Sequence, residues 1–266
     1  MYFKREEVLK FYKVAENDRY DVIKLIDKIE KASRDYTVES TGFVNPLLKK
    51  ICVELLKSRD LNLDYLICGG YDEAEYCEII IYPDYIPKES IDKSISILAI
   101  KLNKFIANIS HRDVLGSLMG LGIKRDQIGD IKIYEDEILV ICTRDIEEFL
   151  LMNFNKIGNK KIKCEKGIWD RLSDGNNGDG KSKNITVSSL RLDSIISNGF
   201  NTSRKIAAEL IKKERVKHNF IVSSSPNVVI DENDIISVRG YGRIKVVKIN
   251  GKTRKDRISI TISIFS

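Results

Sequence analysis

The side chains best suited to chemistry in this chain are the lysines and arginines that recur between residues 191 and 217. From Ser188 onward the sequence has 15 Lys and Arg against 7 Asp and Glu, a net charge of +8, whereas the whole chain carries +6. The residues before Ser188 are therefore slightly acidic. A cationic excess confined to one segment is typical of proteins that neutralise a phosphate backbone. The charge pattern thus predicts a nucleic-acid surface in the last third of the chain.

Two short helical patterns can position these cations. In the first, apolar residues share one face and Gly199 ends the helix. In the second, which Thr202 or Ser203 caps, an apolar face again leaves the basic residues pointing outward. We expect the basic side chains to neutralise the phosphates of a structured RNA, and Ser203 and Asn219 to hydrogen-bond its backbone or base edges. The candidate RNA-binding residues are Arg191, Ser203, Arg204, Lys205, Lys212, Lys213, Arg215, Lys217, Asn219, Arg239 and Arg243.

The end of the chain reads as β-hairpins. Arg239 and Arg243 flank a Gly-Tyr-Gly turn, and isoleucines alternate with Ser and Thr over 258–264. The loop before that last strand carries four basic residues and one acidic residue. It is either a phosphate contact or a solubilising loop that protects a sheet edge.

A second basic group brackets a glycine-rich helical segment. His111 and Arg112 precede this segment, and Lys124 and Arg125 follow it. One interpretation is a second RNA-contact surface, or a docking surface within a ribonucleoprotein. The other is close helix–sheet packing, permitted by the glycines, with a solvated basic rim. The residues themselves leave both open.

Other motifs are incomplete. His111-Arg112-Asp113 resembles part of a kinase catalytic loop, but the downstream Asn, the Asp-Phe-Gly and the glycine-rich phosphate loop are missing. Five scattered cysteines without a Cys-x-x-Cys pair, and only two histidines, argue against zinc. We therefore expect no catalytic residue, no metal and no cofactor.

The composition also bears on location. No apolar run approaches the ~20 residues that a membrane helix needs, and the charged N-terminus lacks the apolar centre of a signal peptide. Cysteines scattered in this way are typical of cytoplasmic proteins, in which thiols stay reduced. We expect a cytoplasmic protein with no membrane partner.

The hydrophobic patterns predict an α+β protein. We expect a helical N-terminal region at 1–61, an α+β domain at 62–172, a polar linker at 173–186 and a C-terminal module at 187–266. Within the second region, strands and helices follow one another as in a ferredoxin-like or RNA-recognition-motif sandwich, without the aromatic signatures of RNA-recognition motifs. Residues 90–110 read there as a long amphipathic helix.

The C-terminal module resembles the S4 RNA-binding domain. The resemblance rests on Arg-Leu-Asp at 191–193, Ser-Arg-Lys-x-Ala at 203–207, Val-x-x-Asn at 216–219 and Asp-Ile-Ile-Ser-Val at 234–238. It implies that the aspartate of the first motif belongs to the helix itself. The Asn-Gly that usually turns the S4 hairpin is Asn219-Phe220 in this chain, which predicts a different turn.

A wider resemblance covers most of the chain from about residue 60. The stretch 110–131, the sequence TVSSLRLDSIIS and the sequence ISVRGYGR are similar, in this order, to the YlmH-like S4 proteins encoded near bacterial cell-division genes. That family implies a helical start, an RNA-recognition-like middle and a C-terminal S4 domain. It also implies ribosomal or transfer RNA as partner, on large ribosomal subunits that carry a stalled peptidyl-tRNA.

Two other functions stay open from the sequence. One is an RNA-modifying enzyme that holds its substrate with the S4 domain, for which His111, Asp113, Asp126 and Asp130 are the crowded candidates. The other is a cell-division adaptor, which only the family's gene neighbourhood suggests.

Overall fold

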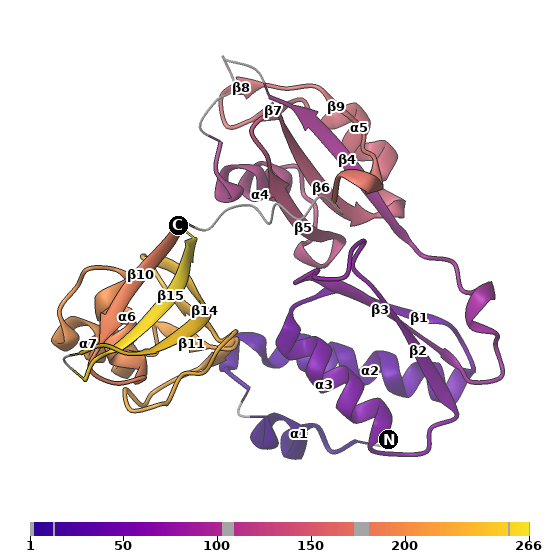
Figure 1. Ribbon diagram of the computed structural model, residues 1–266. Coiled ribbons are helices and arrows are strands. Elements are labelled where there is room, and N and C mark those ends of the chain that lie inside the picture. Colours follow the sequence, from indigo (N-terminus) through magenta and orange to yellow (C-terminus); the bar gives the residue numbers. More distant parts are fainter. Residues whose placement is uncertain (1–2, 13, 103–108, 173–180, 255, 266) are drawn as a thin grey trace. The chain divides into compact units, whose positions relative to one another are not determined.

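A computed structural model describes residues 3–12, 14–102, 109–172, 181–254 and 256–265. The chain divides into two compact units (Figure 1). The first comprises residues 1–9 and 19–178, and the second comprises 10–18 and 179–266. The α+β prediction is confirmed, because helices and small antiparallel sheets occur in both units.

The first unit begins with helices and a three-stranded sheet. The helices are α1 (Arg5–Phe11), α2 (Arg19–Asp35) and α3 (Pro46–Lys57), of which α2 and α3 contact the sheet. The strands are β1 (Glu39–Val44), β2 (Leu63–Cys68) and β3 (Cys77–Pro83), in the antiparallel order β1-β3-β2. Helix α3 starts at the proline that the sequence predicted, and the Asn45 side chain accepts a 3.0 Å hydrogen bond from the Leu48 amide. Strand β1 was not expected, and its pairing with β3 carries the first sheet across the boundary predicted at 61/62.

The rest of the first unit is a ferredoxin-like sandwich. Its elements are β4 (Ile95–Lys101), α4 (His111–Gly120), β5 (Ile128–Ile133), β6 (Glu137–Thr143), α5 (Glu147–Asn153) and β9 (Cys164–Lys166). A small hairpin, β7 (Lys156–Ile157) with β8 (Lys160–Lys161), precedes β9. The sheet order β5-β6-β4-β9, with every pair antiparallel, is the βαββαβ arrangement of the predicted ferredoxin-like sandwich, although its first strand lies where a helix was expected.

Strand β4 corrects the expected long helix at 90–110. Residues 95–101 form one of the two central strands of the sheet, and residues 103–108 lie outside the described part of the chain. Leu98 and Ile100 face α4 and α5 in one core, whereas Ile97 and Ala99 belong to a second core on the other side of the sheet. A strand buried on both faces is apolar throughout, so its sequence lacks the alternation that separates a strand from a helix.

The second core joins the two sheets of this unit. Phe43 from β1, Ile80 from β3, and Leu139 and Ile141 from β6 belong to one buried cluster. The face of the ferredoxin-like sheet opposite its helices is therefore covered by the rest of the unit. RNA-recognition motifs bind bases on such a face, through exposed aromatic side chains. That mode of binding is blocked in this arrangement.

A buried carboxylate locks the same junction. Asp130 in β5 is 8% exposed and accepts hydrogen bonds from the backbone amides of Glu75 (2.9 Å) and Tyr76 (3.0 Å). The Tyr71 hydroxyl donates to the same carboxylate. Next to this contact, the guanidinium of Arg125 lies 3.8 Å from the centre of the Tyr76 ring.

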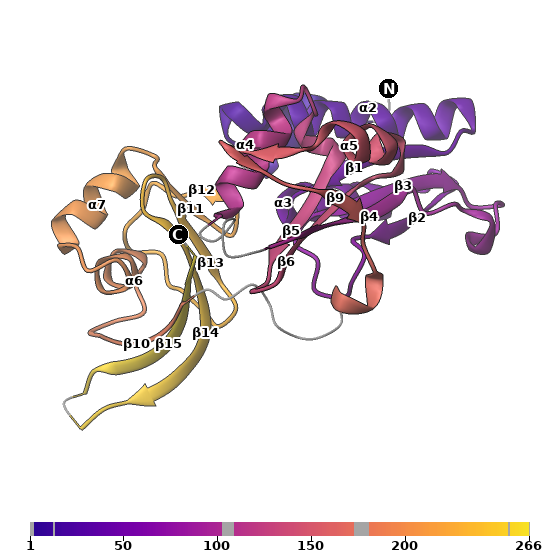
Figure 2. The same ribbon diagram turned by 90° about the horizontal axis from the view of Figure 1, so that it is seen from above.

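The second unit is a six-stranded antiparallel sheet with two helices on one face (Figure 2). The helices are α6 (Leu192–Gly199) and α7 (Arg204–Lys212). The strands are β10 (Lys181–Val187), β11 (Val216–His218), β12 (Ile221–Val222), β13 (Ile235–Val238), β14 (Gly242–Lys252) and β15 (Ile258–Phe265), in the order β10-β15-β14-β13-β11-β12. Both helices and the last hairpin agree with the sequence prediction. A Cβ atom at Gly199 would lie 2.4 Å from Ile244, so this glycine also lets α6 approach the sheet.

Strand β10 also corrects the predicted linker. Residues 181–186, which we expected in the linker 173–186, pair along their whole length with β15. The remainder, 173–180, lies outside the described residues. The strand is polar because only Ile185 and Val187 of its side chains are buried, so its composition is that of a loop.

The turn between β11 and β12 differs from expectation as well. Asn219 has φ of 47° and Phe220 has φ of 69°. Positive φ at both central residues is the signature of the type I′ turn, which Asn-Gly favours. The chain thus keeps the backbone of an Asn-Gly hairpin with phenylalanine in the glycine position.

We predict that Asp130→Ala lowers the free energy of unfolding by about 2 kcal/mol, because partly buried amide donors lose their acceptor. The measurement is chemical denaturation followed by the fluorescence of Trp169, the chain's one tryptophan, which packs beside Gly70 of the same loop. Asp72→Ala removes an exposed carboxylate from that loop and should change stability by less than about 0.5 kcal/mol. Equal effects of the two substitutions would contradict this account.

Candidate RNA-binding surface

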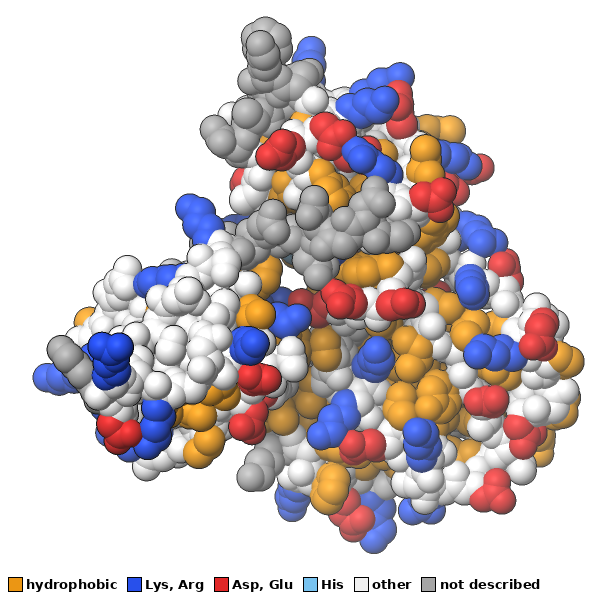
Figure 3. All heavy atoms as spheres, in the orientation of Figure 1, with side chains coloured by type: hydrophobic (Ala, Val, Ile, Leu, Met, Phe, Trp, Pro, Cys, Tyr) orange, Lys and Arg blue, Asp and Glu red, His pale blue; other side chains and the backbone are white. Residues whose placement is uncertain are grey.

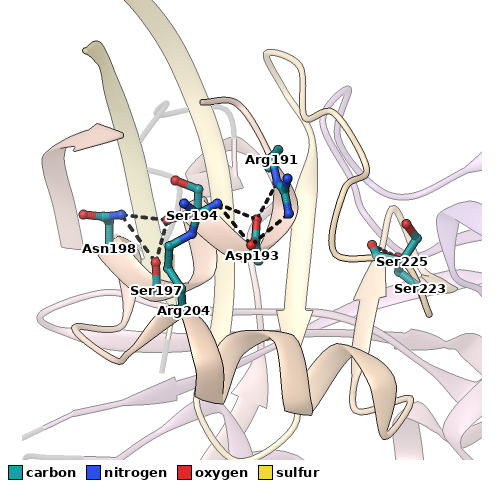
Figure 4. A network of polar contacts seen from close by, with 8 residues as sticks. All are labelled: Arg191, Asp193, Ser194, Ser197, Asn198, Arg204, Ser223 and Ser225. Atoms are coloured by element: carbon teal, nitrogen blue, oxygen red, sulfur yellow. Dashed lines mark hydrogen bonds and ion pairs between the residues drawn. The ribbon is translucent and has the colours of Figure 1, made fainter. Parts of the chain in front are cut away.

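Helices α6 and α7 hold two of the predicted arginines against one aspartate. Arg191 donates from Nε and Nη2 to the two carboxylate oxygens of Asp193, at 3.1 and 3.2 Å. Arg204 donates from Nη2 to the same two oxygens at 3.3 and 3.1 Å. Figure 4 shows the two arginines reaching Asp193 from opposite sides. Asp193 is buried, but 40% and 50% of the two arginine side chains stay exposed.

This arrangement fixes the positions of two guanidinium groups. Each guanidinium has five N–H donors, and the contacts with Asp193 use only some of them. The remaining donors can bind an anion at the surface, and the fixed geometry reduces the entropy lost on binding. The sequence placed Asp193 in the helix but did not reveal this role, because its second partner follows eleven residues later on another helix.

The outer face of α7 carries lysines in a different environment. Lys205 and Lys212 are seven residues apart, hence on one side of the helix, with Glu209 between them. Both lysines and Lys213 are exposed, and none has a carboxylate partner among the described residues. Ser203 caps the helix by accepting a 3.2 Å hydrogen bond from the Ile206 amide. The Ser203 hydroxyl proton can still be donated outward.

Two predicted residues after α7 are engaged within the protein. The Lys217 ammonium lies 2.9 Å from the carboxylate of Asp18, in the segment 10–18 of the same compact unit. Asn219 donates to Asp234 at 2.6 Å and accepts from the Ile235 amide at 2.9 Å. The Asn219 side chain therefore holds the hairpin together, and its predicted contact with RNA would have to compete with these bonds.

Asp234 is the centre of that hairpin network. Its carboxylate also lies 2.7 Å from Nε2 of His218 and accepts from the Asp231 amide at 2.9 Å. Burial alone would raise the pKa of Asp234, but the hydrogen bonds from Asp231, Asn219 and His218 outweigh it. The pKa of Asp234 is therefore lowered from its ordinary 3.8.

The remaining candidates surround the turn between β13 and β14. The Arg239 amide donates to the Arg215 carbonyl at 2.9 Å, which places Arg215 and Arg239 next to each other. Both side chains are exposed. The Arg243 guanidinium lies 5.7 Å from the centre of the Phe220 ring.

The tip of the β14–β15 hairpin is also basic. Figure 3 shows Lys and Arg side chains around this end of the second unit. Lys252 pairs with Asp256 at 2.7 Å, and Arg257 donates to the Thr186 carbonyl at 2.8 Å. Arg254 is exposed, and Lys255 lies outside the described residues. Lys252 and Arg257 therefore stabilise the hairpin through contacts within the protein.

The four residues of the predicted second surface fall into two places. His111 and Arg112 are exposed in the first turn of α4, whereas Lys124 and Arg125 follow its other end, ~15 Å away for a helix of ten residues. Arg125 packs on Tyr76 and donates to the Ile128 carbonyl, so it has a structural role. The glycines of α4 do not serve close packing, because Cβ atoms at Gly116 and Gly120 would meet no heavy atom within 4 Å.

The four residues considered for an RNA-modifying enzyme, His111, Asp113, Asp126 and Asp130, do not form one site. Asp113 caps α4 through Ser110, Asp126 pairs with Lys24, and Asp130 binds the loop at 71–76. A polar cavity of about 380 Å³ does lie in the first unit, and Asp126 is the one candidate that lines it. There burial raises the pKa of Glu78 and lowers that of Lys28.

The described residues contain no group of three or more His, Cys, Asp or Glu side chains that could hold a metal ion. Within the same ranges, every helix is too short or too polar to cross a membrane.

Comparison with known proteins identifies the family. Residues 17–86 match the family described as "YlmH, N-terminal", and residues 87–170 match "Putative RNA-binding domain in YlmH". A Bacillus subtilis (strain 168) protein named "Ribosome-associated protein quality control protein P2" is 33% identical over 228 residues, which cover 85% of this chain and 87% of that protein. The chain belongs to the YlmH family. The two matched segments meet at residues 86 and 87, between β3 and β4.

A solved structure of another family member supports the fold. The "Cell division protein ylmH from Streptococcus pneumoniae" aligns with a TM-score of 0.50 and 26% sequence identity. The alignment covers 59% of this chain and 94% of that one. The family and its relatives support RNA binding and ribosome association as the general function of this chain.

We predict that the hairpin around Asp234 is weakened by acid. Because the pKa of this carboxyl is lowered in the folded protein, its stabilising effect is present above about pH 4 and is lost as the pH falls further. Asp234→Asn should cost about 1 kcal/mol near neutral pH and flatten the loss of stability as the pH falls below about 4.

The measurement is urea denaturation at several pH values. Asp231→Asn is the matched control, because the Asp231 backbone amide, not its side chain, takes part in the network. An equal acid sensitivity of wild type and Asp234→Asn would be inconsistent with this prediction.

Proposed function

We propose that this YlmH-family member is a non-enzymatic, cytoplasmic RNA-binding protein whose second unit is an S4 domain. Its partner would be ribosomal or transfer RNA on large ribosomal subunits that carry a stalled peptidyl-tRNA. The Asp193-held pair of Arg191 and Arg204 is the observation that carries the proposal. The name of the B. subtilis relative supports the ribosomal partner.

The proposed RNA-binding surface would use two kinds of cation in different ways. Arg191 and Arg204, held in place, would orient one or two phosphates by fork-shaped hydrogen bonds. Lys205, Lys212 and Lys213 would contribute charge, because flexible ammonium groups act as point cations. Together these residues would neutralise a continuous stretch of backbone, with affinity that falls as salt rises.

The lysines provide the clean test of the proposal. We predict that Lys205→Gln with Lys212→Gln weakens RNA binding and lowers the slope of log affinity against log salt by about 1–2, close to one per lost phosphate contact. Neither side chain has a hydrogen-bond or ion-pair partner among the residues that the structure describes, so stability should be unchanged. The measurement is fluorescence anisotropy with a hairpin fragment of ribosomal RNA at several salt concentrations.

The matched control is Lys57→Gln with Lys88→Gln, which removes the same charge from exposed positions of the first unit. Should the control lower the salt slope as much as the α7 pair does, binding would be a property of overall charge and the proposed surface would be wrong.

The ribosomal partner needs a separate measurement. We predict that the wild-type protein sediments with large ribosomal subunits in a sucrose gradient at low salt, and that Lys205→Gln/Lys212→Gln shifts toward the top. If both stay at the top at low salt, the ribosome is not the partner.

Asp193→Asn tests whether the arginines must be held. Removing a negative charge beside a phosphate site should strengthen binding if charge alone matters. We predict the opposite, a loss of RNA affinity of about 5- to 10-fold, because both guanidinium groups lose their fixed positions. Circular dichroism would verify that the variant is folded.

A further inference from the structure

The turn between β13 and β14 displays an aromatic ring at the surface. Tyr241 is 40% exposed and stands between Gly240, with φ of 90°, and Gly242, with φ of 116°. Both values lie in the region that favours glycine. Because neither neighbour has a side chain, nothing adjacent in sequence covers the Tyr241 ring.

The ring is held in place by the end of α6. The centres of the Phe200 and Tyr241 rings are 5.7 Å apart, with an angle of 51° between the ring planes. Phe200 is the C-terminal cap of α6, and it packs against the main core of the second unit. This contact orients the Tyr241 ring relative to α6 and α7, which together with their cap residues carry six of the eleven candidate RNA-binding residues.

Arginines surround the same turn. A Cβ atom built on Gly240 would lie 3.7 Å from Nη2 of Arg215, so this guanidinium sits directly beside the turn. The Arg239 amide binds the Arg215 carbonyl at 2.9 Å. Neither Arg215 nor Arg239 has a carboxylate partner in the part of the chain that the structure describes. Two cations with spare donors therefore adjoin one exposed ring.

A flat exposed ring beside exposed arginines fits an unpaired nucleotide. Aromatic side chains stack on bases that are not paired, and guanidinium groups bind the phosphates on either side. We infer that Tyr241 stacks on an unpaired base of the bound RNA while Arg215 and Arg239 bind the flanking phosphates. The inference rests on the proposed function and adds that the preferred RNA is a helix interrupted by an unpaired base. An acidic peptide could use the same arginines but would not require a flat ring.

The experiment compares two RNA hairpins that differ by one bulged 2-aminopurine. The wild-type protein should bind the bulged hairpin about 10-fold more tightly than the fully paired one, in line with the contribution of one stacked base. The fluorescence of 2-aminopurine should fall on binding, as it does when this base stacks. Tyr241→Leu keeps an apolar contact for Phe200 but removes the ring, and it should abolish both effects. Tyr241→Phe should retain them.

The outcomes separate this inference from the proposed function. If the wild type binds both hairpins equally and does not quench 2-aminopurine, stacking is overturned, although salt-sensitive binding through the α7 lysines can stand. If Tyr241→Leu weakens both hairpins to the same degree, the ring serves the fold and not base recognition. If the wild type binds neither hairpin but binds an acidic peptide, the proposed RNA function fails together with this inference.

Discussion

The first unit depends on a sheet that is buried on both faces. Helices α4 and α5 cover one side of β4 and β6, and the β1–β3 sheet covers the other. An RNA-recognition motif leaves its second face open for bases. Here that face joins the two halves of the unit, and Asp130 reinforces the junction with hydrogen bonds to the loop at 71–76. Any RNA contact of the segment at 87–170 must therefore use its helices, loops or edges.

In the second unit, two arginines are held in fixed positions and still keep hydrogen-bond donors at the surface. An exposed lysine is strongly hydrated and flexible, so it contributes mainly long-range attraction. Arg191 and Arg204 are partly desolvated by a buried carboxylate yet keep donors at the surface. The negative charge of Asp193 reduces the local net positive charge, but it fixes the geometry of the two guanidinium groups. Fixed guanidinium groups favour recognition of an RNA backbone of defined shape over nonspecific attraction to any polyanion.

The hairpins of the second unit show that a turn can keep its backbone while its residues change. Phe220 occupies a position that favours glycine, and the network of Asn219, His218 and Asp234 stabilises the surrounding hairpin. Left-handed conformations cost a residue with a side chain about 1–2 kcal/mol. The contact of Arg243 with the Phe220 ring offsets part of that cost.

Local patterns in the sequence were enough to predict α3, α6, α7, the β14–β15 hairpin and the ferredoxin-like elements from α4 onward, because caps, turns and one-sided burial depend on neighbouring residues. They failed at β4, where burial on both faces removes the alternation of a strand, and at β10, where few side chains are buried. The sequence also determined which cations exist, but only the tertiary structure decided their partners. Lys217 meets Asp18 across 199 residues, and Arg204 meets Asp193 between two helices. Such pairs depend on how elements pack, and no spacing along the chain encodes them.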